Sequence, residues 1–231
     1  RAARWRASRC CRTRPRTSTG LLVLTARIKG RKHDSDGIGL FVVDKNVRGV
    51  HCDDYLTIDG RRASEITLNE VEVERGALLT VDAGQLDTLL DRACFAVCAE
   101  AVGAMSALIS MTIDYCQQRK QFGQSIGSFQ ALQHRMSNML IQTELTRSLI
   151  YAACNASDSG HDNAARFARA AKVKATTVGR KVSQEAIQLH GGIATTDEYI
   201  VGHFFKRITA LESWVCSKGE ALKEFMALSP S

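Results

Sequence analysis

The stretch Arg119-Lys120-Gln121-Phe122-Gly123 follows a run of residues, 86–118, whose apolar side chains recur at helical intervals. The recurring side chains are Leu90, Phe95, Val97, Val102, Met105, Ile109 and Ile113. This spacing predicts a long helix that ends near Arg119, because Gly123 and Gly127 interrupt helical structure beyond it. A guanidinium there has a fork of donors that suits a phosphate or pyrophosphate. The structural alternative is a basic last turn that complements the helix dipole, with Phe122 in the core.

A second stretch, Gln188-Leu189-His190-Gly191-Gly192, ends another predicted helix. Because Gly191 and Gly192 have no Cβ, the backbone after this helix can turn tightly and approach a ligand. Gln188 and His190 would then lie beside exposed backbone amides. The alternative is that the glycine pair is an ordinary helix cap.

Both stretches belong to an ordered series that resembles the flavin-binding signatures of the acyl-CoA dehydrogenase family. The series consists of Asp114-Tyr115, Arg119 to Gly123, Phe129-Gln130, His134, Met139, Gln188 to Gly192 and Glu198-Tyr199. The resemblance covers about residues 20 to 210. It implies an FAD-dependent oxidoreductase of fatty acid metabolism that converts an acyl-CoA thioester to the 2,3-enoyl-CoA and passes electrons to an electron-transfer flavoprotein.

The resemblance also assigns residues to FAD. From one subunit, the pyrophosphate and adenosine would be held by Arg119, Gln121, Phe122 and Gln130. From a neighbouring subunit, the same FAD would be reached by Gln188, His190, Gly191 and Gly192. The resemblance therefore implies a homo- or hetero-oligomer, a dimer or tetramer, in which helical bundles meet. Ala194 stands where the family often has Gly, which makes the second loop stiffer.

The expected chemistry needs a carboxylate that removes the α-proton of the thioester while a hydride leaves the β-carbon. When Phe204-Phe205-Lys206-Arg207 is aligned with the family's Tyr-Arg-Asp stretch, Val215 falls at the usual glutamate and Cys216 at the following glycine. Some members carry the base on the first bundle helix, where this chain has Ala93. Neither Val215 nor Ala93 can accept a proton.

The nearest carboxylates become the candidate bases, and these are Glu212, Glu220 and Glu100. Each is explained equally well as a solvent-facing or capping charge. Asp91 matches a position that often contacts the CoA moiety, and an exposed charge at a helix start explains it too. An alternative to an active dehydrogenase is a non-catalytic or truncated subunit that contributes half of a shared FAD site and an oligomer interface.

The predicted fold is mainly α, a four-helix up-and-down bundle preceded by a partial β-domain, and α+β overall. We expect three segments: a basic, disordered segment at 1–18, a partial β-barrel-like domain at 19–80 and the bundle at 81–231. The predicted strands are 21–26, 40–43 and 65–73, with a turn signal at Ser35-Asp36-Gly37. The predicted helices are 86–118, 129–156, 162–190 and 196–226. A bundle core is predicted from Leu132, Met136, Met139, Leu140, Leu145 and Leu149. The N-terminal helical domain of the family and the first half of its β-domain have no counterpart here.

The net charge of +7 comes from seven arginines within residues 1–18, and the rest of the chain carries 24 basic and 24 acidic residues. Nucleic-acid binding is not expected, because only Trp5 could stack on a base beside these arginines. The eight scattered cysteines are typical of reduced intracellular thiols, and their spacing favours no zinc site. No membrane span is expected. Bacterial cytoplasm is the expected location, with the mitochondrial matrix as the alternative.

Overall fold

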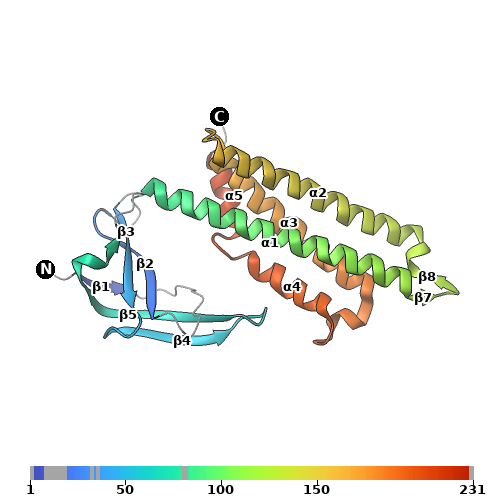
Figure 1. The fold of residues 1–231 in the computed structure, drawn as a ribbon, viewed down its shortest axis with the longest axis horizontal. Coiled ribbons are helices and arrows are strands. Elements are labelled where there is room, and N and C mark those ends of the chain that lie inside the picture. The colour runs from blue at the N-terminus through green and yellow to red at the C-terminus, as the bar shows by residue number, and fades with distance from the viewer. Residues whose placement is uncertain (1–2, 8–19, 32–33, 35–36, 80–82, 229–231) are drawn as a thin grey trace. The chain divides into compact units, whose positions relative to one another are not determined.

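The computed structural model describes residues 3–7, 20–31, 34, 37–79 and 83–228. The chain divides into two compact units, Arg1–Leu89 and Leu90–Ser231. Strands build the first unit and helices build the second (Figure 1). The fold class is therefore mainly α with a β part, as predicted.

Antiparallel sheets form the first unit. Its strands are β1 (Ala3–Ala7), β2 (Leu21–Arg27), β3 (Ile38–Asp44), β4 (Val50–Leu56), β5 (Arg62–Val73) and β6 (Leu78–Leu79). One sheet has the order β1-β5-β4 and the other has the order β2-β3-β6. A single 3-10 turn, Arg75–Ala77, precedes β6. The three predicted strands lie within β2, β3 and β5.

The register of β2 and β3 explains the small core of this unit. Leu24 pairs with Phe41, and both are buried together with Val43 and Val71. Every second side chain of β3 is buried, as expected for a strand with one face on a core. At the turn that joins the two strands, Gly37 has a φ of 79°. The other two residues of the predicted turn, Ser35 and Asp36, lie outside the described residues.

The expectation that residues 1–18 are disordered is wrong for Ala3–Ala7. This segment forms β1, which pairs antiparallel with β5. The pairing register shifts between Trp5 and Arg6, opposite Glu70, whose φ is 51°. An extra residue of this kind is a β-bulge. The remaining residues of the predicted segment lie outside the described residues.

In the described residues, the second unit consists of helices, the first of which begins before Leu90. They are α1 (Ala83–Gln118), α2 (Gln130–Asp158), α3 (Ala164–His190), α4 (Ile200–Leu211) and α5 (Lys218–Ala227). In Figure 1 the chain reverses direction between α1 and α2 and again between α2 and α3, which gives the predicted up-and-down arrangement. Short elements join the helices: β7 (Lys120–Gln121), β8 (Gln124–Ser125), and 3-10 turns at Ile126–Ser128 and Gly191–Thr195.

Helix α1 is the apolar centre of the bundle. Met105 and Leu108 are fully buried, and Cys94, Cys98 and Cys116 fill small sites in the same core. The expectation that no segment is long and apolar enough for a membrane span is wrong for this helix, because Gly84–Gln118 meets both criteria. Within its most apolar window, 56% of the residues are buried in the protein. More than half of this window therefore packs inside the bundle.

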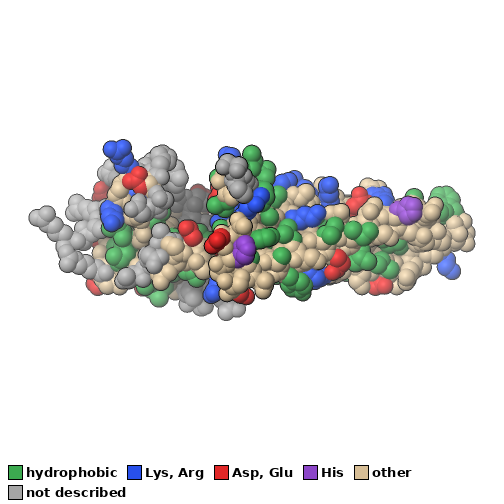
Figure 2. Space-filling model, turned by 90° about the horizontal axis from the view of Figure 1, so that it is seen from above, with side chains coloured by type: hydrophobic (Ala, Val, Ile, Leu, Met, Phe, Trp, Pro, Cys, Tyr) green, Lys and Arg blue, Asp and Glu red, His purple; other side chains and the backbone are tan. Residues whose placement is uncertain are grey.

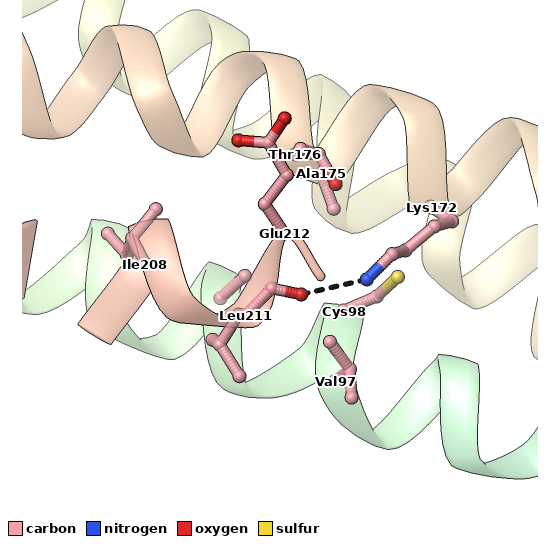
Figure 3. A pocket seen from close by; sticks show the side chains of 9 residues that line it. Val97, Cys98, Lys172, Ala175, Thr176, Ile208, Leu211 and Glu212 are labelled. Atoms are coloured by element: carbon pink, nitrogen blue, oxygen red, sulfur yellow. Dashed lines mark hydrogen bonds between the residues drawn. The ribbon is translucent and has the colours of Figure 1, made fainter. Parts of the chain in front are cut away.

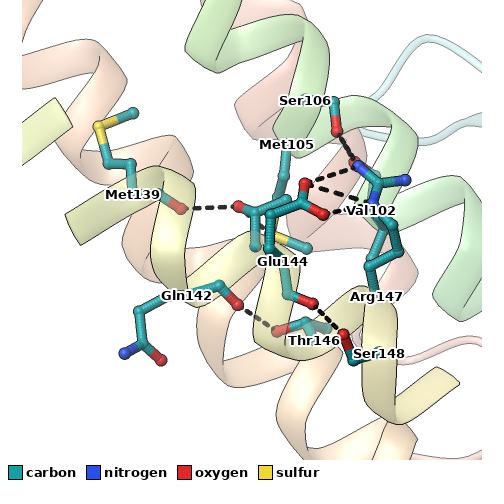
Figure 4. Close-up of polar contacts among 10 residues, drawn as sticks. Val102, Met105, Ser106, Met139, Gln142, Glu144, Thr146, Arg147 and Ser148 are labelled. Carbon is teal, nitrogen blue, oxygen red and sulfur yellow. Dashed lines mark hydrogen bonds and ion pairs between the residues drawn. The ribbon is translucent and has the colours of Figure 1, made fainter. Parts of the chain in front are cut away.

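Helix α2 packs on α1 partly through polar groups (Figure 4). Arg147 Nη2 donates to Ser106 Oγ of α1 at 2.7 Å, and Arg147 Nε donates to Glu144 at 3.1 Å. The buried hydroxyl of Thr143 donates to the Met139 carbonyl one turn earlier at 2.8 Å. This bond satisfies a polar group that would otherwise be costly in the core.

The predicted core stripe of α2 is only partly correct. Met139 is buried, and Leu132, Met136 and Leu149 pack against the core. Leu140 and Leu145 are instead 48% and 53% exposed, because a residue next to a core position lies about 100° around the helix from it. Hydrophobic side chains are accordingly visible on the surface of the helical unit in Figure 2.

The predicted fourth helix, 196–226, is wrong because two shorter helices replace it. Helix α4 ends at Leu211, and α5 begins after Ser217. Ser217 Oγ accepts from the backbone N–H of Glu220 at 3.2 Å, while the Glu220 carboxylate accepts from the backbone N–H of Ser217 at 2.8 Å. This reciprocal capping box defines a new helix start, and Val215 before it has a φ of 67°, which breaks the helical path.

Candidate flavin site and the α4–α5 connection

The first predicted flavin segment is a tight hairpin between α1 and α2. Lys120 pairs with Ser125 and Gln121 pairs with Gln124, so Phe122 and Gly123 form the two-residue turn. Both turn residues have positive φ, 53° and 79°. Positive φ at both positions matches the twist of a hairpin, but for a bulky side chain such as Phe122 it is strained. Strained backbone of this kind is concentrated at functional sites.

Polar and aromatic groups of this hairpin face solvent. The Phe122 side chain is 90% exposed, with an edge contact to Phe129 at a centroid distance of 6.2 Å. Arg119, Gln121 and Gln130 are exposed as well. No ion pair joins Arg119 to another residue in the described parts of the chain. The predicted structural alternative, with Phe122 in the core, is therefore wrong.

The second predicted flavin segment is the end of α3. Gly191 has φ 70° and ψ −151°, a combination that is essentially restricted to glycine. A Cβ placed on Gly191 or Gly192 would meet no atom within 4 Å, so both backbones border open space. Gln188 is exposed, whereas His190 is only 3% exposed.

His190 joins the two segments within one chain. Its ring stacks on Tyr115 of α1 at a centroid distance of 4.5 Å and lies 5.4 Å from the ring of Tyr199. Burial, followed by the nearby Tyr115, raises the pKa of Tyr199. Since Tyr115 is one turn from Arg119, both flavin segments lie at the same end of the same bundle. That a neighbouring subunit reaches the same FAD with the second segment stays a prediction.

One buried atom at this end lacks a partner. His190 Nδ1–H donates to the Ala186 carbonyl at 2.8 Å, which leaves Nε2 as an acceptor. This Nε2 atom is buried and has no hydrogen-bond partner in the described residues. An unsatisfied acceptor, an unpaired guanidinium, an exposed aromatic ring and two open glycines together fit a dinucleotide that carries a pyrophosphate and hydroxyl groups.

The connection between α4 and α5 contains the position where the family's base is expected. Val215 is 43% exposed there, and Ala93 of α1 is also exposed. Lys172 of α3 is 1% exposed, and its Nζ donates to the Leu211 carbonyl at 2.9 Å (Figure 3). The same Nζ donates to the Trp214 carbonyl at 2.9 Å, so Lys172 holds this connection in place. A buried charge with two such partners satisfies the carbonyls that end α4.

Three cysteines gather beside Lys172. Cys216 hydrogen-bonds Cys94, which in turn hydrogen-bonds Cys98. The bond with Cys216 acts to lower the pKa of Cys94, but the bond with Cys98 and burial outweigh it and raise that pKa to about 12. The bond with Cys94 and burial raise the pKa of Cys216. The thiols of Cys94 and Cys216 therefore stay protonated at neutral pH. No set of metal ligands is found in the described parts of the chain.

The three candidate bases each have a structural partner. Glu212 pairs with Arg180, and Glu100 makes two hydrogen bonds to Arg207, at 2.6 and 2.8 Å. The Arg207 guanidinium also lies over the Trp214 ring at 4.5 Å. Hydrogen bonds from the Ser217 backbone and side chain lower the pKa of Glu220. A base for this chemistry needs a raised pKa, which the surroundings of Glu220 oppose.

Asp91, the candidate CoA contact, lies in an ion-pair network. Arg169 of α3 contacts both Asp91 of α1 and Glu224 of α5. The Asp91 and Arg169 side chains are only 16% and 15% exposed. The explanation of Asp91 as an exposed helix-start charge is therefore wrong, since Asp91 is largely buried in a network in which Arg169 links three helices.

Sequence reasoning missed Lys172 and the thiol group. A signal for Lys172 was available, because it lies on the apolar side of α3 with Ala168, Ala171 and Ala175. The sequence Ser217-Lys218-Gly219-Glu220 has the capping-box spacing that starts α5. Nothing local in the sequence connects Cys94 with Cys216, which are brought together only by the fold.

Comparison with known proteins is consistent with this geometry. Residues 84–215 match the family described as acyl-CoA dehydrogenase, C-terminal domain. The acyl-CoA dehydrogenase IpdE2 of Mycolicibacterium smegmatis is 33% identical over 154 residues, which cover 67% of this chain and 47% of that protein. The probable acyl-CoA dehydrogenase YngJ of Bacillus subtilis is 28% identical over 197 residues, covering 82% and 52%. The chain spans about half the length of the curated relatives it matches.

Solved structures share the fold. Butyryl-CoA dehydrogenase from Megasphaera elsdenii superposes with a TM-score of 0.80 at 22% identity, covering 92% of this chain and 56% of that one. A glutaryl-coenzyme A dehydrogenase in complex with glutaryl-CoA gives 0.82 at 24% identity, covering 91% and 54%. The family match covers more than half of the chain. The chain therefore belongs to the acyl-CoA dehydrogenase family, with residues 84–215 as the C-terminal domain.

Proposed function

We propose that this chain holds the pyrophosphate and adenosine part of FAD in an assembled acyl-CoA dehydrogenase. The whole enzyme would oxidise an acyl-CoA thioester to the 2,3-enoyl-CoA and pass the electrons to an electron-transfer flavoprotein. The observation that carries the proposal is the stacking of His190 on Tyr115, which gathers the donors of both flavin segments at one end of the bundle.

The chain's own residues have separate tasks in this proposal. Arg119 offers two parallel N–H donors to the pyrophosphate, and Phe122 covers an apolar face of the dinucleotide beside it. The backbone at Gly191 and Gly192 permits close approach, because no Cβ stands in the way. When FAD is bound, it supplies the acceptor for the hydride that leaves the β-carbon of the thioester.

We further propose that the catalytic base comes from outside the positions usual for the family. Val215 and Ala93 cannot accept a proton, while Glu100 and Glu212 are paired with arginines. These two ion pairs fit a hetero-oligomer in which this chain is a non-catalytic subunit. Turnover by this chain with one of the candidate carboxylates is the alternative, and it requires the carboxylate to leave its arginine partner.

Flavin retention tests the first part of the proposal. The protein is loaded with FAD, gel-filtered, and its flavin absorbance is compared between the wild type and Arg119→Ala. We expect affinity for FAD to fall about 10- to 100-fold, because a charge-assisted hydrogen bond contributes roughly 1.5–3 kcal/mol. Arg92→Ala is the matched control, since Arg92 is an exposed arginine near the opposite end of α1. Equal retention by both variants would remove Arg119 from the site.

Anaerobic mixing with acyl-CoA thioesters tests the base. If this chain is the flavin-holding partner only, its yellow colour will persist with every thioester. Bleaching by the chain alone would instead identify it as a complete dehydrogenase, and Glu100→Gln, Glu212→Gln and Glu220→Gln would then show which carboxylate acts. If the flavin of the Val215→Glu variant is bleached by a thioester, then only a catalytic base was lacking at the α4–α5 connection.

A further inference from the structure

The exposed side of α2 is apolar. Four large side chains of this helix are between 48% and 67% exposed: Leu140, Ile141, Leu145 and Tyr151. With about 100° of rotation per residue, all four fall within roughly 140° of the helix circumference, so they form one side. In Figure 1 α2 is the uppermost helix of the bundle, and Figure 2, which is seen from above, shows hydrophobic side chains along this part of the surface. We call these four residues the α2 patch.

The polarity of this stretch is reversed relative to a typical surface helix. Thr143 and Thr146 lie on its buried side, where their hydroxyls donate to carbonyls of the preceding turn at 2.8 and 2.7 Å. A surface helix normally turns its apolar side to the core and its polar side to water. An apolar patch on the outer side is instead typical of a surface that another molecule covers. We therefore expect the α2 patch to be covered in the assembled protein.

The α2 patch carries little charge. Between residues 137 and 152, all of which the structure describes, Glu144 is the single exposed charged side chain. Its carboxylate accepts from Arg147 Nε at 3.1 Å and from Arg147 Nη2 at 3.2 Å, so its charge is balanced within the chain. A strongly charged partner would find no opposite charge here, whereas a second copy of the chain would meet no like charge.

Small residues lie beside the α2 patch. Ser137, Ser148 and Ala152 are exposed on the same side of the helix. Because the distance between packed helices depends on the side chains at the contact, small residues beside large ones allow a second helix to approach closely. Interfaces between identical subunits are more apolar than those with transient partners, and a twofold dimer brings the same patch of both copies together. An apolar patch without net charge therefore favours a second copy of this chain as the occupant.

We propose that the α2 patch is a twofold interface through which two copies of this chain form a dimer. Contact between the two patches removes the exposed apolar side chains of both copies from water, which is the main driving force for such association. None of the four patch residues belongs to the flavin segments, and dimerisation requires no bound FAD. The test of this interface is therefore independent of the proposed flavin site.

Sedimentation equilibrium of the full chain over a wide range of concentrations tests the proposal. The wild type should form dimers. Ile141→Glu/Leu145→Glu brings like charges together at the twofold interface and should raise the dimer dissociation constant at least about a hundredfold. Leu222→Glu/Met226→Glu is the matched control, because it adds the same charges at exposed apolar positions of α5 and should dimerise like the wild type.

Mixing oppositely charged variants shows whether the α2 patch meets itself. Ile141→Lys/Leu145→Lys alone should also fail to dimerise, because lysines then face lysines. An equimolar mixture of the Glu and Lys variants should form heterodimers, since carboxylates then face ammonium groups. A fluorescent label on one variant lets sedimentation distinguish the heterodimer from residual homodimers.

Four results would overturn the proposal. A wild type that stays monomeric at every concentration would mean that a different partner covers the patch. Dimers that persist in the Glu variant, or that the α5 control loses equally, would place the interface elsewhere. Monomers in the mixture of Glu and Lys variants would mean that the patch meets a different surface. Melting curves followed by circular dichroism confirm that each variant is folded.

Discussion

The flavin end of the bundle and the α4–α5 connection use their charged and strained residues in opposite ways. At the flavin end, and among the residues that the structure describes, Arg119 is exposed without an ion pair and His190 Nε2 is buried without a partner. At the connection, Lys172 donates to two carbonyls, and Glu212 pairs with Arg180. The polar groups of the first region therefore remain available to a ligand. The charged groups of the second region instead stabilise the turn between α4 and α5.

This difference separates binding from stability. A side chain that is unsatisfied within the chain contributes little to folding, so removing it should affect ligand affinity more than unfolding. A side chain that satisfies buried carbonyls should affect unfolding first. The α4–α5 connection, where the family expects a base, is therefore built here as a structural joint.

The largest expected effect is the loss of Lys172. Lys172→Met keeps the side chain's length but leaves the Leu211 and Trp214 carbonyls without their donor. We expect the free energy of unfolding to fall by about 3 kcal/mol, measured by urea denaturation. Lys181→Met, on the exposed side of the same helix, should change it by less than about 0.5 kcal/mol. Equal losses would mean that the buried lysine has no special role.

The next effect concerns the backbone at the flavin end. Gly191→Ala places a Cβ in a conformation that side chains rarely adopt, and it should lower the free energy of unfolding by about 2 kcal/mol. Gly192→Ala is the matched control, because Gly192 borders the same open space without a positive φ. Thermal or urea unfolding of the two variants will show whether conformation rather than space determines the need for glycine. An equal cost at both positions would contradict this explanation.

The next prediction compares Phe122 at the flavin end with Val215 at the α4–α5 connection, two bulky residues that both have positive φ. Phe122→Gly and Val215→Gly should each raise the free energy of unfolding by about 1 kcal/mol, because glycine removes the strain. Only Phe122→Gly should weaken FAD retention, since it removes the exposed ring. Retention is measured by flavin absorbance after gel filtration. A loss of flavin from Val215→Gly would connect the two regions functionally.

The smallest effect is a pH dependence that arises beside Lys172. Because the pKa of Cys94 is raised from 9.0 to about 12, the folded state holds the thiol proton more tightly than the unfolded state does. This contribution to stability is complete below pH 9 and is lost as pH rises from 9 toward 12. The free energy of unfolding should therefore decline above pH 9, and less steeply in Cys94→Ala. Parallel slopes for the two proteins would exclude Cys94 as the source.

Local patterns were sufficient for most of the secondary structure. The apolar spacing of α1 and the alternation in β5 each reflect a face that meets a core, so they can be read from the chain directly. The pattern failed in α2, where Leu140 and Leu145 are apolar but exposed. It failed again at 196–226, where the capping box of Ser217 and the positive φ of Val215 divide one apolar run into two helices.

The sequence by itself determined the ordered flavin series, because Arg119 to Gly123 and Gln188 to Gly192 are short, contiguous motifs at helix ends. It also predicted that Val215 and Ala93 stand at the usual base positions, and neither side chain can accept a proton. Only the tertiary structure decided that the ends of α1 and α3 meet, where the Tyr115 ring stacks on the His190 ring. It alone gave Lys172, Cys94 and Cys216 their shared environment, because contacts between distant segments depend on how helices pack, which no local pattern encodes.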